Sequence, residues 1–311
     1  MNPLVSIVVP TFNGGRSLRR LLASIAEQRS DVSREVIAVD SGSTDDTLDI
    51  LCDSGARVES VAPETFNHGG TRNTALSRAR GEFAVLTVQD AVPANREWLG
   101  ELLQPLLRDT RIAGTYARQK PWPEASRLTA HYLAKWAAAT AEPRLVGPLR
   151  PTAFDAMSPA DRHFTCAFDN VCSCIRMSVW HAHPFKRTSI AEDLEWAKEV
   201  LTSGYRLAYV PSALVSHSHE RTVRYELERT YLVHQRLQSL FGLSTVPDIP
   251  SLVRAICSTL PLHLRLAAAE GDRHGRAMAR AAGLAVAWPL GQYLGARSAR
   301  EGRELLQTRG V

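Results

Sequence analysis

The chain has 311 residues, of which 44% are hydrophobic and 22% are charged. This composition is typical of a globular protein and excludes collagen-like, disordered and disulfide-scaffold chains. The formal net charge is +5, and residues 252–311 carry nine arginines against four acidic residues, so the charges balance over residues 1–251. Because the body of the chain has no basic excess, we expect no nucleic-acid partner.

The cysteines and the apolar runs bear on the cellular compartment. No two cysteines form a CxxC pair, which argues against a zinc knuckle or a thioredoxin-like site, and we expect reduced, buried thiols in a cytosolic protein. The first apolar run, residues 4–9, is too short for a signal peptide. The longest uncharged stretch, residues 281–296, is shorter than the about 20 residues of a membrane helix. The cysteines are Cys52, Cys166, Cys172, Cys174 and Cys257, with the third and fourth expected on one face of a strand.

Strand and helix signals alternate over the first 120 residues. Short apolar or β-branched runs predict strands, and leucines at helical spacing predict helices. Ser43 with Asp46 resembles a capping box at the start of the second helix. Gly81 is expected to end a helix over residues 71–80. The other helices are expected around residues 18–25 and 97–107, and the strands over residues 5–9, 36–39, 83–88 and 112–116.

This alternation predicts an α/β protein with a mostly parallel sheet that helices cover on both faces. Six prolines from Pro121 to Pro159 predict an irregular, partly helical insertion. Beyond it we expect, in order, a strand over residues 171–175, a helix over residues 192–203, short strands over residues 207–210 and 213–217, and a helical region after Thr222.

Three polar clusters follow predicted strands, at residues 10–15, 40–46 and 89–93. Ligands of open parallel sheets bind beyond the carboxyl ends of the strands, so three clusters at that edge favour a nucleotide site. The chain has no GxxxxGK[ST] loop, no GxGxxG after the first strand and no GxSxG elbow. What remains is a nucleotide site in which one acidic residue binds the nucleobase or the ribose. A second acidic residue there would hold a metal ion on the diphosphate.

Four of these segments resemble motifs of family 2 glycosyltransferases. The segments VSIVVPTFN (5–13) and VIAVDSGSTD (36–45) are similar to the N-terminal half of that family, and FNHGGTRN (66–73) and TVQDAVP (87–93) are similar to its bacterial rhamnosyltransferases. The likeness covers roughly residues 4–220. It implies a GT-A fold, which is a Rossmann-like, mostly parallel sheet flanked by helices, here with a helical C-terminal extension. It also implies a nucleoside-diphosphate sugar donor and a divalent metal, Mn²⁺ or Mg²⁺.

The resemblance divides the chain into a nucleotide-sugar-binding half (1–120), an acceptor-binding and catalytic half (121–221) and a basic helical extension (222–311). Asp40 would accept a hydrogen bond from the ring N–H of thymine or uracil. Arg72 would contact the diphosphate, with a surface ion pair as the alternative. The donor-binding residues that the resemblance implies are Pro10, Thr11, Asn13, Asp40, Ser41, Gly42, His68, Arg72, Gln89 and Asp90.

The implied metal ligands begin with Asp90, which matches the second acid of the family's DxD element. Val88 occupies the first acid position, so reduced metal affinity, or none, stays open. His217 and His219 follow a predicted strand, and the family often has a metal-ligating histidine there; a solvent-facing or merely hydrogen-bonded pair is the alternative. An imidazole ligand would favour Mn²⁺ over Mg²⁺.

Glu192 and Asp193 resemble the family's ED motif, which opens a helix beside the acceptor and implies that both are catalytic. Asp193 would be the base that takes the proton from an acceptor hydroxyl in a single displacement with inversion. Alternatively, the two acids only interact favourably with the helix dipole. Gln119 and Trp122 follow another strand at a place where similar transferases contact the acceptor or the sugar, although Trp122 could also be a core anchor.

The sequence therefore predicts an inverting glycosyltransferase that moves L-rhamnose from dTDP-L-rhamnose to a hydroxyl of a cell-surface glycan or its lipid-linked precursor. A UDP-hexose or UDP-N-acetylhexosamine donor is one alternative. A non-catalytic domain that binds a nucleotide sugar or glycan is another, and Val88 is its main support. We expect a cytoplasmic protein whose extension contacts the inner membrane face, forms a dimer interface or is merely a solvated appendage.

Overall fold

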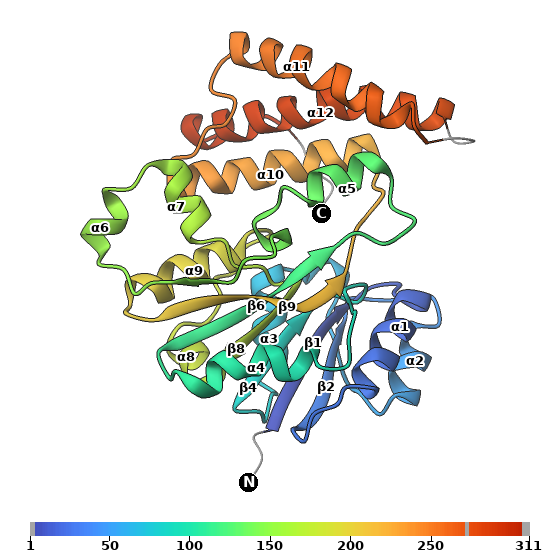
Figure 1. Ribbon diagram of the computed structural model, residues 1–311, viewed down its shortest axis with the longest axis vertical. Coiled ribbons are helices and arrows are strands. Elements are labelled where there is room, and N and C mark those ends of the chain that lie inside the picture. Colours follow the sequence, from blue (N-terminus) through green and yellow to red (C-terminus); the bar gives the residue numbers. More distant parts are fainter. Residues whose placement is uncertain (1–3, 271–273, 307–311) are drawn as a thin grey trace.

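The computed structural model describes residues 4–270 and 274–306. Figure 1 shows a central sheet in the lower part of the molecule and three long helices stacked above it. The strands are β1 (Leu4–Thr11), β2 (Ser33–Asp40), β3 (Arg57–Ser60), β4 (Phe83–Thr87), β5 (Val92–Pro93), β6 (Ile112–Lys120), β7 (Arg144–Val146), β8 (Cys172–Arg176) and β9 (Arg206–Ser216).

The helices cover both faces of the sheet and form the upper layer. Two 3₁₀ turns, η1 (Pro63–Thr65) and η2 (Ala137–Ala139), interrupt the connections. The α-helices are α1 (Gly15–Ala26), α2 (Thr47–Asp53), α3 (His68–Leu76), α4 (Trp98–Arg108), α5 (Arg127–Leu133), α6 (Pro151–Asp155), α7 (Pro159–Thr165), α8 (Met177–Ala182), α9 (Glu192–Thr202), α10 (Val223–Phe241), α11 (Ile249–Ala267) and α12 (His274–Glu301).

The strands of the described residues form one sheet in the order β3-β2-β1-β4-β8-β6-β9-β5, with β7 paired to β9. Strands β1 to β4 pair in parallel, as the alternating pattern predicts, and so do β6 and β9. Strand β8 runs antiparallel between β4 and β6, and it joins the two parallel parts. Periodicity reports that a segment is a strand but not its direction, so this antiparallel insertion was not predictable from the pattern.

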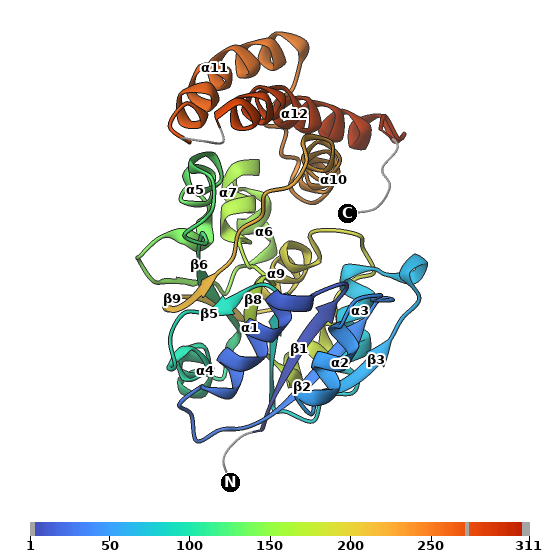
Figure 2. The same ribbon diagram turned by 90° about the vertical axis from the view of Figure 1, so that its right-hand side faces the viewer.

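Alternate residues of the buried strands supply the two layers of the core. Val5, Ile7 and Val9 pack with α1, α2 and α4, whereas Val8 packs on the opposite face with α3, α8 and α9. These strand residues are fully buried. Figure 2 shows α1 and α2 in front of β1 and β2. Helices therefore cover both faces, as expected for strands that are apolar on both sides.

Two local predictions at the second and third helices are wrong. Helix α2 has Asp46 as its N-cap residue, but that side chain makes no capping bond, and Ser43 instead donates to Asp40. Helix α3 begins at His68 and ends at Leu76, earlier than predicted. Gly81 does not end it. A Cβ atom at Gly81 would lie 2.7 Å from the Ser6 nitrogen of β1, so this glycine permits close contact between two backbones.

The region from Pro121 to Pro159 is irregular and partly helical, as predicted, and it lies between the sheet and the upper helices (Figure 2). The two short strands predicted around Pro211 are one strand, β9, whose pairing with β6 shifts register beside that proline. All five cysteines are free. Cys172 and Cys174 are buried on one face of β8, as predicted, but Cys52 and Cys257 are exposed, so the expectation of buried thiols is wrong for those two.

Helices α10, α11 and α12 make up the predicted helical extension, of which residues 271–273 and 307–311 lie outside the described part of the chain. Helix α12 packs closely on α10 because it has glycine at the contact: a Cβ atom at Gly295 would collide with the Tyr231 carbonyl oxygen, and one at Gly291 would lie 2.9 Å from the Leu227 oxygen. Among the described helices, none combines the length and the apolarity that crossing a bilayer requires.

Candidate functional site

The first part of the site is a loop held together by Asp40. Strands β1 and β2 end side by side, with Thr11 and Asp40 as register partners. The Asp40 carboxylate is buried and accepts hydrogen bonds from the Thr11 hydroxyl (3.0 Å), the Gly42 nitrogen (3.0 Å), and the Ser43 nitrogen (2.9 Å) and hydroxyl (2.5 Å). Ser41 donates its nitrogen and its hydroxyl to the Thr11 oxygen. Since a carboxylate has about four lone-pair positions, these four donors fill them.

The polar clusters after β1, β2 and β4 meet at this edge of the sheet, as predicted. Asn13 has a left-handed backbone (φ 47°), and its side-chain oxygen accepts from the Thr44 nitrogen at 2.8 Å. The Gln89 amide accepts from the Phe12 nitrogen and donates to the Phe12 oxygen, both at 2.9 Å. The candidate donor-binding residues that the structure gathers here are Pro10, Thr11, Asn13, Asp40, Ser41, Gly42 and Gln89.

The second part of the site is a cluster of three metal-ligand side chains: Asp90, His217 and His219. Strand β5 pairs with β9, and this pairing brings Asp90, two residues before β5, next to the residues that follow β9. His219 Nδ1 lies 3.3 Å from Asp90 Oδ2, His217 Nε2 lies 3.8 Å from Asp90 Oδ1, and the two Nε2 atoms are 3.0 Å apart. Within the described residues, this group brings its ligand atoms within 4.8 Å of one another.

The protonation of this cluster suits a divalent metal. Desolvation lowers the pKa of His217, and it lowers the pKa of His219 to about 4, so both imidazoles are neutral at pH 7. Neutral imidazole is the form that binds metals. Val88 packs its side chain against the core, so it offers no ligand. One carboxylate and two imidazoles therefore fit a divalent cation without the first acid of the DxD element.

The third part of the site lies at the start of α9, where Glu192 is buried in an ion pair with Arg72 of α3. Arg72 Nη1 lies 2.7 Å from Glu192 Oε1, and both side chains are 5% exposed. Asn170 also donates to Glu192, at 3.2 Å. Desolvation alone would raise the pKa of Glu192, but the positive charges of Arg72 and His68 and the bond from Asn170 outweigh it, so this pKa is lowered. Arg72 is thus paired inside the protein and not on its surface, and its contact with the diphosphate stays a prediction.

The pKa of Asp193, the neighbour of Glu192, is shifted in the opposite direction. Its carboxylate accepts from the Leu194 nitrogen (2.8 Å) and the Asn170 nitrogen (3.2 Å) and has no cationic partner among the described contacts. Desolvation, together with the charges of Glu192 and Asp169, raises the pKa of Asp193 to about 8. A carboxyl group that only interacted with the helix dipole would have a lowered pKa. A pKa near physiological pH suits a general base.

Asp169 and Gln119 connect the second and third parts of the site, and the motifs did not identify Asp169. Gln119 donates to Asp169 Oδ2 at 2.6 Å, while its oxygen lies 2.9 Å from His217 Nδ1. Asp169 immediately precedes Asn170, whose nitrogen donates to Asp193. Gln119 is buried and both ends of its amide have partners within the protein, and its contact with the acceptor stays a prediction. A lone aspartate before a strand carries no local signal for this role.

The two remaining candidates lie at the edge of the site. His68, at the start of α3, has its ring nitrogen 3.4 Å from Arg72 Nη1, so it borders the buried ion pair. Trp122 is half-buried, outside the hydrophobic core, and the Arg20 guanidinium lies 5.5 Å from the centre of its ring. Its backbone nitrogen donates to Ser218, between the two candidate histidine ligands. Trp122 is therefore not a core anchor, and its contact with an acceptor stays a prediction.

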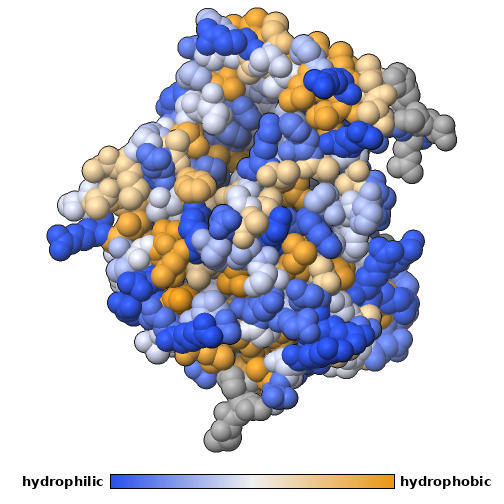
Figure 3. Space-filling model, viewed as in Figure 1, coloured by the Kyte–Doolittle hydropathy of each residue, from blue (hydrophilic) through white to orange (hydrophobic). Residues whose placement is uncertain are grey.

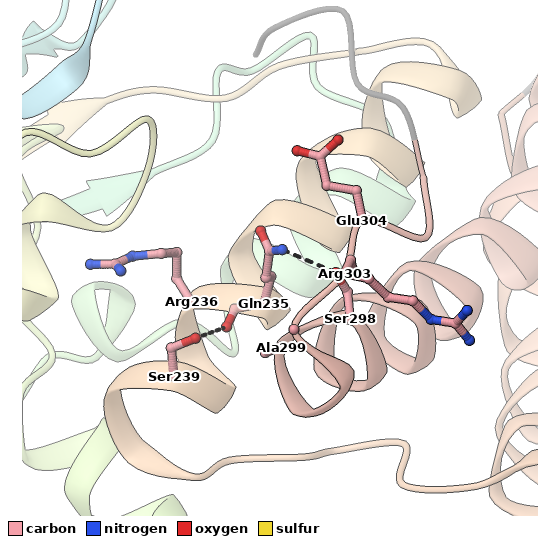
Figure 4. Close-up of a pocket in the computed structure, with 8 residues that line it drawn as sticks. Gln235, Arg236, Ser239, Ser298, Ala299, Arg303 and Glu304 are labelled. Atoms are coloured by element: carbon pink, nitrogen blue, oxygen red, sulfur yellow. Dashed lines mark hydrogen bonds between the residues drawn. The ribbon is translucent and has the colours of Figure 1, made fainter.

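A separate cavity of about 270 Å³ lies between α10 and the end of α12 (Figure 4). Gln235 donates to Ser298 on its wall at 3.0 Å. Arg236 also lines it, and this arginine forms an ion pair with Glu195 at 2.7 Å. None of the candidate residues from the sequence lines this cavity.

Known proteins resemble this chain in sequence and in fold. The model of glycosyl transferase family 2 matches residues 6–162. The O-antigen chain rhamnosyltransferase WbaN of Salmonella anatum is 31% identical over 233 residues, covering 74% of this chain and 70% of that protein. The O-antigen chain rhamnosyltransferase RfbN of Salmonella typhimurium is 27% identical over 237 residues, covering 73% and 70%.

A solved structure extends the likeness to nearly the whole fold. The mannosyltransferase PcManGT from Pyrobaculum calidifontis, in complex with GDP-Man and Mn²⁺, matches with a TM-score of 0.61 at 18% identity, covering 98% of this chain and 89% of that chain. The expected GT-A architecture with a helical C-terminal region is thereby confirmed.

Proposed function

This chain belongs to glycosyl transferase family 2 and is a glycosyltransferase, and we propose that it moves L-rhamnose from dTDP-L-rhamnose to a hydroxyl of a cell-surface glycan or its lipid-linked precursor. The identity of 31% and 27% to two O-antigen chain rhamnosyltransferases supports this donor. The observation that carries the proposed chemistry is the contact chain from Asp90 through the two histidines, Gln119 and Asp169 to the neighbourhood of Asp193.

In the proposed reaction, Asp193 takes the proton from the acceptor hydroxyl. The hydroxyl oxygen forms a bond to the anomeric carbon as the bond from that carbon to the diphosphate breaks, and the nucleoside diphosphate leaves with the electron pair. One attack from the face opposite the leaving group inverts the configuration. The buried pair with Arg72 keeps Glu192 ionised and occupied, so we assign Glu192 a positioning role beside the base.

Asp90, His217 and His219 would hold the divalent cation. When bound, it would stabilise the negative charge of the departing diphosphate. Two imidazole ligands favour Mn²⁺ over Mg²⁺. The non-catalytic alternative rested on Val88, and the two histidines offer the ligands that this position lacks.

Recognition of the base by Asp40 requires a local rearrangement. All lone-pair positions of its carboxylate are occupied, two of them by Ser43. Rotation of the Ser43 hydroxyl would free one position for the ring N–H of thymine. The same position would accept uracil, so this contact does not distinguish dTDP-L-rhamnose from a UDP-hexose or UDP-N-acetylhexosamine.

A thermal-shift panel tests the donor. With Mn²⁺ present, dTDP-L-rhamnose should raise the melting temperature more than UDP-glucose or UDP-N-acetylglucosamine, since a ligand at 100 times its Kd adds about 2.7 kcal/mol. Stronger stabilisation by a UDP-sugar would replace the rhamnose assignment with that alternative.

Replacement of Asp193, the proposed general base, tests the reaction mechanism. Asp193→Asn should lower the rate of transfer by about 10²–10⁴-fold, because a general base contributes that much, while the Kd for the donor changes by no more than a few-fold. Asp161→Asn, on an exposed turn of α7, is the matched control and should transfer normally. Normal turnover by Asp193→Asn would refute the assigned mechanism.

We also propose that the enzyme is cytoplasmic and contacts the inner membrane face through α11. Ile249 and Val253 on this helix are 61% and 54% exposed, Arg254 is exposed next to Val253, and Arg265 is exposed in the last turn of the helix. Figure 3 shows apolar and polar patches side by side over the upper helices. Apolar side chains combined with arginines favour anionic lipid. A dimer interface on the same face is the alternative.

A further inference from the structure

The two neighbours of Gln119, Asp169 and His217, determine the orientation of its side-chain amide. Its nitrogen lies 2.6 Å from Asp169 Oδ2, and its oxygen lies 2.9 Å from His217 Nδ1. The Asp169 carboxylate also accepts from Trp136 Nε1 (2.8 Å) and from the Val171 nitrogen (2.9 Å), so it accepts from three donors. Because a carboxylate only accepts hydrogen bonds, the NH₂ group of Gln119 must face Asp169. The Gln119 oxygen must therefore face the histidine.

This amide in turn determines the tautomer of His217. An amide oxygen only accepts, so Nδ1 of His217 must carry the hydrogen and donate it to Gln119. When one imidazole nitrogen carries the hydrogen, the other nitrogen presents the lone pair that a metal binds. His217 Nε2 faces the place where His219 and Asp90 also present ligand atoms.

The other two ligand side chains, His219 and Asp90, lie close to His217 and to each other. His219 Nε2 lies 3.0 Å from His217 Nε2, and His219 Nδ1 lies 3.3 Å from Asp90 Oδ2. Ligand atoms of the three side chains lie within 4.8 Å of one another, so one divalent cation would contact all three.

We propose that Asp169 and Gln119 are positioning residues that hold His217 in its Nδ1–H tautomer and so leave Nε2 free to bind a divalent metal. This inference rests on the metal site of the proposed function and goes beyond it by assigning the two residues that prepare the ligand. Partners behind a ligating histidine typically change metal affinity by 10–100-fold. The residue after Asp169, Asn170, donates its backbone nitrogen to Asp193.

The first measurement is the affinity of the full chain for Mn²⁺ in the absence of nucleotide. The EPR signal of the free ion monitors the titration. Gln119→Met keeps the length of the side chain and removes both hydrogen bonds, so the Kd for Mn²⁺ should rise 10–100-fold. Gln104→Met, the same change at an exposed position of α4, should bind like wild type. Mn²⁺ binding by Gln119→Met within threefold of wild type would overturn the proposal.

The second measurement needs no metal and detects the tautomer directly. Long-range ¹H–¹⁵N spectra of the metal-free chain should show the His217 hydrogen on Nδ1 in wild type, and on Nε2 in a substantial fraction of Gln119→Met. If the hydrogen of His217 lies on Nε2 in the wild-type protein, the proposed positioning by Gln119 and Asp169 is refuted, even if the protein binds Mn²⁺. If wild type binds no Mn²⁺, the ligand role fails, while sugar transfer by the same preparation still tests the proposed function separately.

Discussion

Adjacent carboxyl groups at the first turn of α9 differ because only one of them has a cationic partner. Glu192 pairs with Arg72 and stays ionised, whereas Asp193 faces two other acids, Glu192 and Asp169. Environment thus separates the pKa values of two chemically similar side chains, which is how a site assigns one carboxylate to structure and another to proton transfer.

The raised pKa of Asp193 predicts the pH dependence of transfer. As the proposed base, Asp193 must be ionised to accept a proton, and below a pKa of about 8 it is increasingly protonated. With saturating donor and metal, kcat/KM should therefore rise with pH through about 8 and level off only above about pH 9. Glu192→Gln removes a neighbouring negative charge, so the rise should move to lower pH. A pH profile of Glu192→Gln identical to wild type would contradict this electrostatic account.

At the scale of elements, the Arg72–Glu192 pair joins α3 to α9 across 120 residues of sequence. Arg72→Met leaves Glu192 buried without its counter-charge, which should cost about 3–5 kcal/mol of stability. Arg19→Met removes an exposed pair with Asp46 and should cost at most about 1 kcal/mol. Urea unfolding measures both variants. An equally small loss in Arg72→Met would mean that water reaches Glu192.

Helices α10 and α12 pack closely because residue 295 of α12 is a glycine and has no side chain. Gly295→Ala adds a Cβ atom against the Tyr231 carbonyl oxygen, so it should cost about 1–3 kcal/mol. Gly275→Ala, in the same helix but with no atom within 4 Å of its Cβ, should stabilise the protein by up to about 1 kcal/mol. Thermal unfolding compares the two. A neutral Gly295→Ala would mean that the two helices separate without loss.

At the scale of the whole molecule, α11 lies at the end of the protein farthest from the sheet (Figure 1). If α11 contacts the membrane, the chain should co-sediment with vesicles rich in phosphatidylglycerol more than with phosphatidylcholine vesicles. Ile249→Asp with Val253→Asp should reduce that binding at least tenfold. Leu107→Asp with Leu145→Asp, two residues that are each 56% exposed elsewhere, is the control and should bind like wild type.

Two results would contradict the membrane contact. Equal binding of wild type and the α11 variant would show that this face does not mediate it. A concentration-dependent dimer that only the α11 variant loses, without any vesicle binding, would assign the face to a second copy of the chain. Sedimentation velocity distinguishes that outcome.

The elements with strong local signals were predictable. Apolar runs predicted β1, β2 and β4, and the spacing of leucines predicted α1, because a strand or helix buried against a core must repeat its apolar residues with the period of its backbone. The ordered motifs also predicted the family and its fold. Helix boundaries were less predictable, since Asn67, which caps α3, looks like any other loop residue.

The sequence by itself determined the elements, the family and the types of side chain available for catalysis. Only the tertiary structure decided which of them pair: Arg72 with Glu192, and Gln119 with His217 and Asp169. These partners lie 50 to 120 residues apart and meet through the antiparallel entry of β8 and the register of β6 with β9. A residue's neighbours along the chain carry no information about such a partner, because hydrogen bonds and charges act between side chains that only the packed sheet brings together.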